Sequence, residues 1–164
     1  MPLQLKINEA GFILVESLVA ITIVVVGLLG IFALLSRSLS LNRVVADRYT
    51  AAYLAAEGIE IVKNLVDNNL IKDRPWNTGL AAGRYEADHD DLLLAAVEGR
   101  SLNLDEQSGR YSYAAGQLTR FYRLINLELL GGGEELKVYS TVRWTGRGGA
   151  NFQVDLEDHF LNWR

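Results

Sequence analysis

The chain has 164 residues, of which 49% are hydrophobic, and this length indicates one folded domain plus an appended segment. Its net charge is −4, and no stretch concentrates lysine or arginine, so the charge predicts no nucleic-acid partner. The absence of cysteine excludes disulfides, thiolate catalysis and cysteine-based zinc sites.

The first predicted element is an apolar run from Phe12 to Leu35, in which only Glu16, Ser17 and Thr22 are polar. As a helix with a rise of about 1.5 Å per residue it measures roughly 36 Å, more than the roughly 30 Å hydrocarbon core of a bilayer. A cleaved secretory signal has a shorter apolar region that is followed by a small-residue cleavage site. A buried core helix would need a larger domain around it. We therefore expect residues 12–35 to span a membrane.

Glu16 is the anomaly in this run, because acidic side chains inside spans are costly and usually have a functional partner. One interpretation places Glu16 at the membrane interface, where it reaches water. The other begins with Gly11 and Phe12, a small-to-bulky junction between the polar leader of residues 1–11 and the apolar run. A protease that cuts there gives Phe12 a new α-amino group. The Glu16 carboxylate of a neighbouring subunit can then pair with that ammonium.

The stretch GFILVESLVAITIVVVGLLG, residues 11–30, resembles the prepilin N-terminal cleavage and methylation motif of type IV pilins and type II secretion pseudopilins. Its ESLVAITIV portion is especially similar to minor pilins and pseudopilins. The resemblance implies that a prepilin peptidase cleaves after Gly11 and that Phe12 is then N-methylated. It also implies that Glu16 makes the assembly contact. The motif covers only residues 1 to about 40.

The resemblance implies a structural subunit, a minor pilin or pseudopilin, of a type IV pilus or related type II secretion-like filament. The expected partners are other pilin subunits, the prepilin peptidase, an inner-membrane assembly platform and, before assembly, membrane lipid. The expected location is the cytoplasmic membrane, through a single span, and then an extracytoplasmic filament at the cell surface. The subunit is expected to have no cofactor and no enzyme activity, since a separate ATPase would supply the force.

A second hypothesis belongs to another class of protein. A single-pass, membrane-anchored extracytoplasmic binding or sensor domain that does not polymerise explains the span and the domain that follows it. It leaves the spacing of Gly11, Phe12 and Glu16 as a coincidence.

The helical pattern continues beyond the span. Apolar residues recur at spacings of three and four along one helix face: Val45, Tyr49, Ala52, Ala56, Ile59, Val62 and Val66. Asp67, Asn68 and Asn69 supply a polar stop, and Pro75 follows. We therefore expect an amphipathic second half over residues 36–67, in a continuous helix of roughly 80 Å.

Beyond the helix the period changes to that of strands. Residues 119–130, 135–146 and 151–163 alternate apolar and polar side chains and are separated by glycine-containing turns, which predicts an antiparallel meander. Shorter strands or a further hairpin are expected in residues 83–90, 101–105 and 109–116. The face of the middle strand that should pack on the helix consists of Leu136, Val138, Ser140, Val142 and Trp144. The predicted class is α+β, with a long N-terminal helix packed against the antiparallel sheet of a globular domain, residues 68–164.

The acidic stretch EADHDD, residues 86–91, is the one candidate for a cation site. A calcium loop needs a glycine turn and a distal bidentate glutamate, and neither is at the expected offset, so a solvated acidic loop is favoured. The glycine clusters 131–133 and 146–149 lack the lysine of a phosphate-binding loop and indicate hairpin turns. No local signature of serine–histidine–aspartate catalysis is present. We therefore predict no catalytic or metal site.

Overall fold

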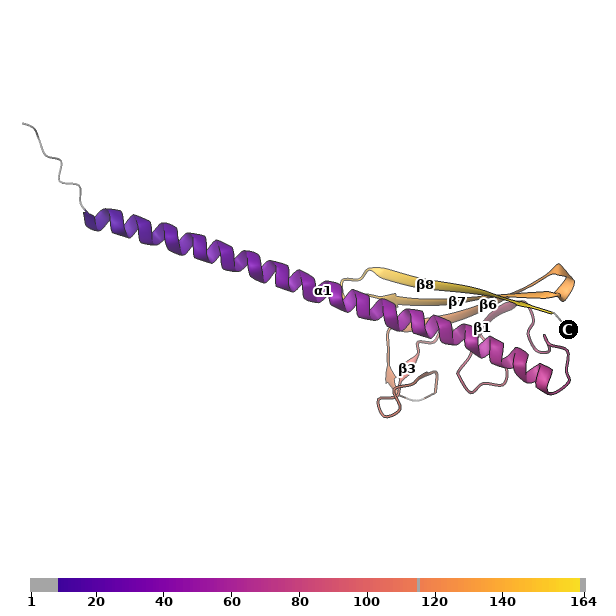
Figure 1. The fold of residues 1–164 in the computed structure, drawn as a ribbon. Coiled ribbons are helices and arrows are strands. Elements are labelled where there is room, and N and C mark those ends of the chain that lie inside the picture. Colours follow the sequence, from indigo (N-terminus) through magenta and orange to yellow (C-terminus); the bar gives the residue numbers. More distant parts are fainter. Residues whose placement is uncertain (1–8, 115, 163–164) are drawn as a thin grey trace, which may run out of the picture. The chain divides into compact units, whose positions relative to one another are not determined.

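The computed structural model describes residues 9–114 and 116–162 (Figure 1). One long helix, α1 (Glu9–Ile71), is followed by an antiparallel sheet, so the predicted α+β class is confirmed. The chain divides into two compact units, Met1–Val45 and Ala46–Arg164. The first contains the N-terminal part of α1, and the second contains the remainder of α1 and all the described strands.

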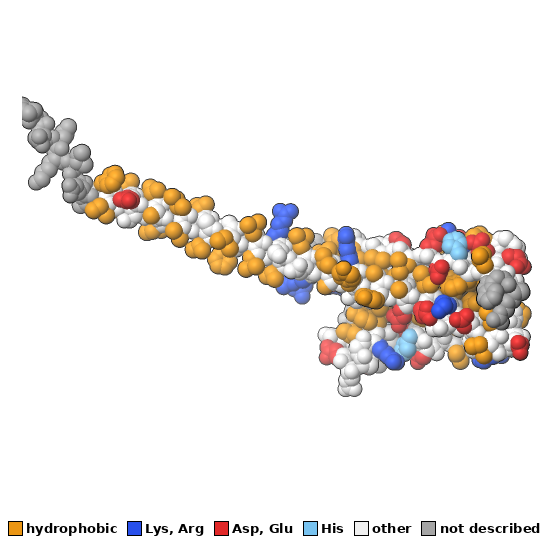
Figure 2. All heavy atoms as spheres, in the orientation of Figure 1, with side chains coloured by type: hydrophobic (Ala, Val, Ile, Leu, Met, Phe, Trp, Pro, Cys, Tyr) orange, Lys and Arg blue, Asp and Glu red, His pale blue; other side chains and the backbone are white. Residues whose placement is uncertain are grey.

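In the first unit the side chains of α1 are open on every side. All residues from Gly11 to Arg43 are exposed, including the large apolar ones. Figure 2 shows hydrophobic side chains over the visible face of this part of the helix. The helix is long and apolar enough to cross a membrane, and none of its most apolar window is buried. Length and composition are therefore compatible with a single-pass anchor.

From Val45 onward the buried face of α1 differs from the predicted one. Val45, Tyr49 and Ala56 of the predicted stripe are exposed. The face that is buried consists of Ala51, Leu54, Ala55, Gly58, Ile61, Val62, Leu65, Val66 and Asn69. Glycine is needed at one position of this face, because a β-carbon at Gly58 would lie only 2.3 Å from the Ser140 Oγ. The missing side chain lets the helix and β7 approach closely there.

The predicted end of the helix is also wrong, since α1 continues through the polar residues to Ile71. Asn69 is buried and donates hydrogen bonds from its Nδ2 to the carbonyl oxygens of Trp76, at 3.1 Å, and Thr78, at 2.8 Å. Its amide therefore holds the loop that follows the helix. Asparagine often ends helices, but in this helix its side chain stabilises both the last turn and the loop that follows.

The main sheet has five antiparallel strands in the order β2-β1-β6-β7-β8. Their bounds are β1 (Gly83–Glu86), β2 (Ala95–Ala96), β6 (Phe121–Leu130), β7 (Glu135–Thr145) and β8 (Asn151–Leu161). A short 3-10 turn, η1 (Gly131–Gly133), joins β6 to β7. The smaller sheet, in the order β4-β3-β5, is made of β3 (Asn103–Leu104), β4 (Tyr111–Ser112) and β5 (Gln117–Leu118). The predicted meander of three long strands is confirmed.

The core lies between this sheet and the second-unit part of α1. The predicted face of β7 is confirmed, since every second residue from Leu136 to Trp144 is buried. One hydrophobic cluster joins Leu136 and Val138 to Val62 of the helix, among others. A second cluster joins Val142 and Trp144 to helix residues around Leu54. The second unit therefore has a hydrophobic core of its own.

A buried arginine side chain lies in this core. The side chain of Arg123, on β6, is fully buried, and its Nη1 lies 2.7 Å from the Glu57 Oε2 of α1. Its Nη2 donates to the Ala87 carbonyl oxygen at 2.6 Å. The guanidinium thus joins the helix, the sheet and the segment after β1. The sequence pattern does not predict these contacts.

Candidate functional site

The expected site residues lie at the beginning of α1, in the first unit. Gly11, Phe12 and Glu16 are helical and exposed, and Phe12 has 69% of its surface accessible. Phe12 and Glu16 are four residues apart, so their side chains lie on one face of the helix, one turn apart. Apart from its chain neighbours and the backbone of its own helix, no described atom lies within 4 Å of the position of a β-carbon at Gly11. Packing within the described chain therefore does not explain glycine at this position.

The Gly11–Phe12 peptide bond lies in the first turn of the helix, which begins at Glu9. The first four N–H groups of a helix have no intrahelical partner, and helix ends fray more readily than interiors. A protease that needs an extended substrate can therefore reach this bond by unwinding only the helix end. Residues 1–8 of the expected leader lie outside the described residues.

The surroundings of Glu16 set it apart from the other polar residues of the apolar run. The Ser17 hydroxyl donates to the Ile13 carbonyl oxygen at 2.8 Å, and the Thr22 hydroxyl donates to the Leu18 carbonyl oxygen at 2.7 Å. Both hydroxyls are thus satisfied inside the helix and are compatible with an apolar medium.

The Glu16 carboxylate, in contrast, makes no hydrogen bond or ion pair with any residue that the structure describes. An unpaired carboxylate in hydrocarbon is costly, and Glu16 lies beyond the first turn of α1, over which a helix N-terminus favours a negative charge. The beginning of α1 is therefore suited to bind a cation supplied by another molecule.

No protein-family model, curated protein or solved structure matches this chain. The function must therefore be inferred from the residues of the chain itself.

The acidic stretch after β1 is held by protein donors. Both carboxylate oxygens of Asp88 accept the Tyr113 N–H at 3.0 Å, and the Asp91 Oδ2 accepts the Asp88 N–H at 2.7 Å. Burial raises the pKa of Asp88, while the Tyr113 N–H acts in the opposite direction. Burial also raises the pKa of Tyr113 to about 12. Within residues 9–114 and 116–162, no group of three or more histidine, aspartate or glutamate side chains is placed to hold a metal ion.

Glu86 is a buried carboxylate whose role the sequence analysis did not predict. Only 2% of its surface is exposed, and its Oε1 accepts the backbone N–H groups of Glu98, Gly99 and Arg100 at 3.2, 2.7 and 3.1 Å. Its Oε2 accepts from the Arg100 Nε at 3.0 Å, a bond that raises the pKa of Arg100. The positive φ of Gly99 lets the three amides converge on one oxygen. Glu86 thereby fixes the segment that follows β2.

Proposed function

We propose that the chain is a structural subunit of a type IV pilus or related type II secretion-like filament, most closely a minor pilin or pseudopilin. The observation that carries the proposal is Glu16, which has no partner among the described residues and lies in the exposed, mainly apolar part of α1, just after the Gly11–Phe12 junction. The satisfied hydroxyls of Ser17 and Thr22 support it, because they leave the carboxylate as the polar group that needs a partner.

In the proposed sequence of events, residues 12–35 hold the precursor in the cytoplasmic membrane with its leader on the cytoplasmic side. A prepilin peptidase removes residues 1–11, and the new amino group of Phe12 is methylated. The Glu16 carboxylate of one subunit then pairs with the Phe12 ammonium of its neighbour. Each charge removes the cost of holding the other in an apolar layer, so the pair sets the axial register of the filament. The subunit itself catalyses nothing.

A membrane-anchored binding or sensor domain that does not polymerise is the second candidate. It is favoured by the second unit, which has two hydrophobic clusters of its own. This candidate gives no role to the Glu16 carboxylate, which has no partner among the described residues, and for that reason we prefer the filament subunit.

The intact mass of the chain purified from membranes separates the two candidates. The filament function predicts loss of residues 1–11 and the addition of one methyl group to Phe12. A chain that keeps residues 1–11 while it is functional supports the non-polymerising anchor and contradicts the filament function.

A Glu16→Ala variant tests the assembly contact separately from processing. We expect the variant to be cleaved and methylated normally but to be missing from sheared filaments. Thr22→Ala is the matched control, because it removes a polar group of the same span that already bonds within its own helix. Entry of Glu16→Ala into filaments at the wild-type level would show that the ion pair is not required.

A further inference from the structure

Two basic side chains follow the apolar run of the first unit. Arg37 and Arg43 are exposed, and they are the only charged residues between Glu16 and Asp47. Figure 2 shows basic side chains that project from α1 beyond its most apolar part. We call residues 36–43 the basic collar, because these two cations come directly after the run that is long and apolar enough to cross a membrane.

Neither arginine has a partner among the described residues. Arg37 and Arg43 make no hydrogen bond or ion pair with any residue that the structure describes. Asp47, the first acidic residue after the collar, is paired with Arg120 instead. The described part of the chain therefore does not offset the positive charge of the basic collar.

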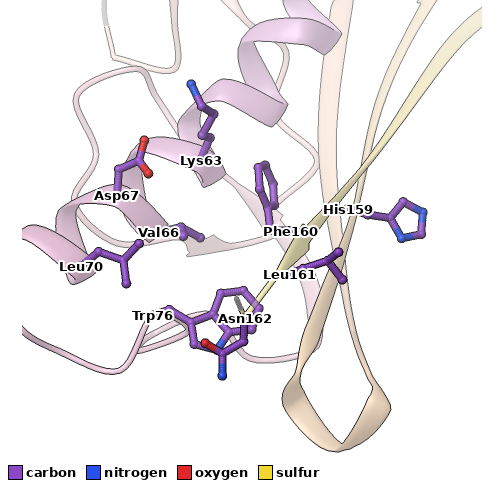
Figure 3. Close-up of a pocket in the computed structure, with 9 residues that line it drawn as sticks. All are labelled: Lys63, Val66, Asp67, Leu70, Trp76, His159, Phe160, Leu161 and Asn162. Atoms are coloured by element: carbon purple, nitrogen blue, oxygen red, sulfur yellow. The ribbon is translucent and has the colours of Figure 1, made fainter. Parts of the chain in front are cut away.

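The charges near the C-terminal end of α1 are arranged differently. A pocket of about 350 Å³ lies there, between α1 and the end of β8, and its apolar walls include Val66 and Phe160 (Figure 3). Lys63 and Asp67 both line this pocket, and the Lys63 Nζ lies 3.4 Å from the Glu60 Oε1. Because two carboxylates accompany one ammonium, the pocket presents no excess positive charge, whereas the basic collar does.

The basic collar lies close to the phospholipid headgroups when residues 12–35 span a bilayer. The headgroup layer is about 5–7 Å thick on each side, and a moderate tilt takes up the excess length of the apolar run. Arg37 follows Leu35 by about 3 Å of helix, and Arg43 follows it by about 12 Å. Side chains of a helix lean toward its N-terminus, so the long side chain of Arg43 reaches back toward this layer. Both guanidinium groups can therefore contact lipid phosphates.

The other residues of the basic collar suit the same layer. Leu39 and Leu41 are 52% and 57% exposed, and small serines alternate with them. Apolar side chains at a membrane interface can contact acyl chains while neighbouring cations contact headgroups. Arg37 and Arg43 are six residues apart, so they point about 120° apart around the helix axis. The two arginines therefore contact different lipids.

We propose that Arg37 and Arg43 bind the phosphate groups of anionic phospholipids where α1 leaves the membrane. A guanidinium group binds phosphate through parallel N–H donors. A zwitterionic lipid carries its own ammonium beside the phosphate, whereas an anionic lipid leaves the phosphate charge to the protein. Each arginine therefore favours anionic lipid by about fivefold at low salt. The proposal needs only the membrane span, which both candidate functions share, and it holds whichever side of the membrane the second unit occupies.

The natural chain contains no cysteine, so a dye attached to Ser40→Cys reports on the basic collar alone. We would reconstitute the labelled full-length chain in phosphatidylcholine vesicles with a minor share of phosphatidylglycerol, and place a quenching acyl chain on one lipid or on the other. The ratio of the two quenching efficiencies measures the enrichment of anionic lipid around the collar. We expect Arg37→Gln and Arg43→Gln each to lower this enrichment by about fivefold. Arg48→Gln is the matched control, because Arg48 is also exposed and without a partner among the described residues but follows Leu35 by about 20 Å of helix.

Ionic strength gives a second readout. Sodium chloride should lower the enrichment, because salt screens exposed charges, and sodium phosphate of the same ionic strength should lower it to a similar extent. A much larger effect of phosphate would show that the arginines prefer free phosphate and would overturn the proposal. Wild-type enrichment in the double variant Arg37→Gln/Arg43→Gln, or an equal loss in Arg48→Gln, would overturn it as well.

These outcomes are separate from the test of the filament function, because neither cleavage nor assembly is measured in the vesicles. A chain that keeps residues 1–11 while it is functional contradicts the filament function but leaves the lipid preference of the basic collar intact.

Discussion

The close approach of α1 to the sheet makes Gly58→Ala an informative perturbation. The added β-carbon would lie 2.3 Å from the Ser140 Oγ, 3.2 Å from the Ser140 Cβ and 3.3 Å from the Arg123 Cδ. Rotation of the hydroxyl relieves only the first of these contacts. Overpacking of this kind destabilises a protein by up to about 3 kcal/mol. Alanine offsets about 1 kcal/mol of this loss, because it favours the helix more than glycine does. We therefore expect the free energy of unfolding to fall by about 2 kcal/mol.

Ser140→Ala is the second half of this test. The Ser140 Oγ is buried without a hydrogen-bond partner in the described part of the chain, so its removal should be neutral or stabilising by up to about 1 kcal/mol. In that background Gly58→Ala loses its worst contact. We expect a coupling energy of about 1–2 kcal/mol between the two substitutions.

The assay is urea and thermal unfolding of the full chain in detergent, followed by the fluorescence of the buried Trp76 and Trp144. A loss of about 2 kcal/mol lowers the Tm of a unit of this size by roughly 6–10 °C. Ala56→Gly, at an exposed position of the same helix, measures the propensity contribution alone. The reasoning is refuted when Gly58→Ala is at least as stable as wild type, or when Ser140→Ala leaves its effect unchanged.

Three further predictions concern charged groups of the second unit. Glu57→Ala leaves the buried Arg123 guanidinium without its carboxylate and should cost about 2–3 kcal/mol in urea unfolding; a neutral result would contradict the buried pair. Glu86→Gln removes the charge that fixes the segment after β2, so a loss of about 1–3 kcal/mol and faster amide exchange at residues 98–100 are expected. The pKa of His159 is raised above 6.5, chiefly by its hydrogen bond with Glu157 and further by its hydrogen bond with Glu135. The resulting stabilisation is complete below pH 6.5 and is lost as the pH rises through the raised value; an NMR titration of His159, with His159→Asn as the control, measures it.

The sequence predicted the structure best in segments where the pattern of apolar residues is regular and each face of the element has one kind of environment. The alternation in residues 119–130, 135–146 and 151–163 predicted three strands and the buried face of β7, because one face of the sheet packs on the core and the other meets solvent. The apolar run predicted a helix long and apolar enough to cross a membrane, and α1 has this length and composition. In the strands, the alternation of apolar and polar residues indicates which way each side chain points.

The sequence was least informative where small or polar residues determine the packing. The buried face of α1 includes Ala51, Ala55 and Gly58, whose small size permits close contact with the sheet, whereas Tyr49 is exposed. Asn69 continues the helix because its amide bonds to a loop that the sequence cannot place beside it. The partners of the buried Arg123 and Glu86 are likewise tertiary, and no local spacing encodes them.

The hydrogen bonds that Ser17 and Thr22 make within α1 affect which environment the first unit can occupy. With both hydroxyls satisfied, most of the helix surface presents only hydrocarbon, which lipid tails and another apolar helix contact about equally well. In the proposed filament function, exchange between these two environments is then nearly balanced. A neighbouring subunit that offers a positive charge to Glu16 would shift the helix from lipid into the filament.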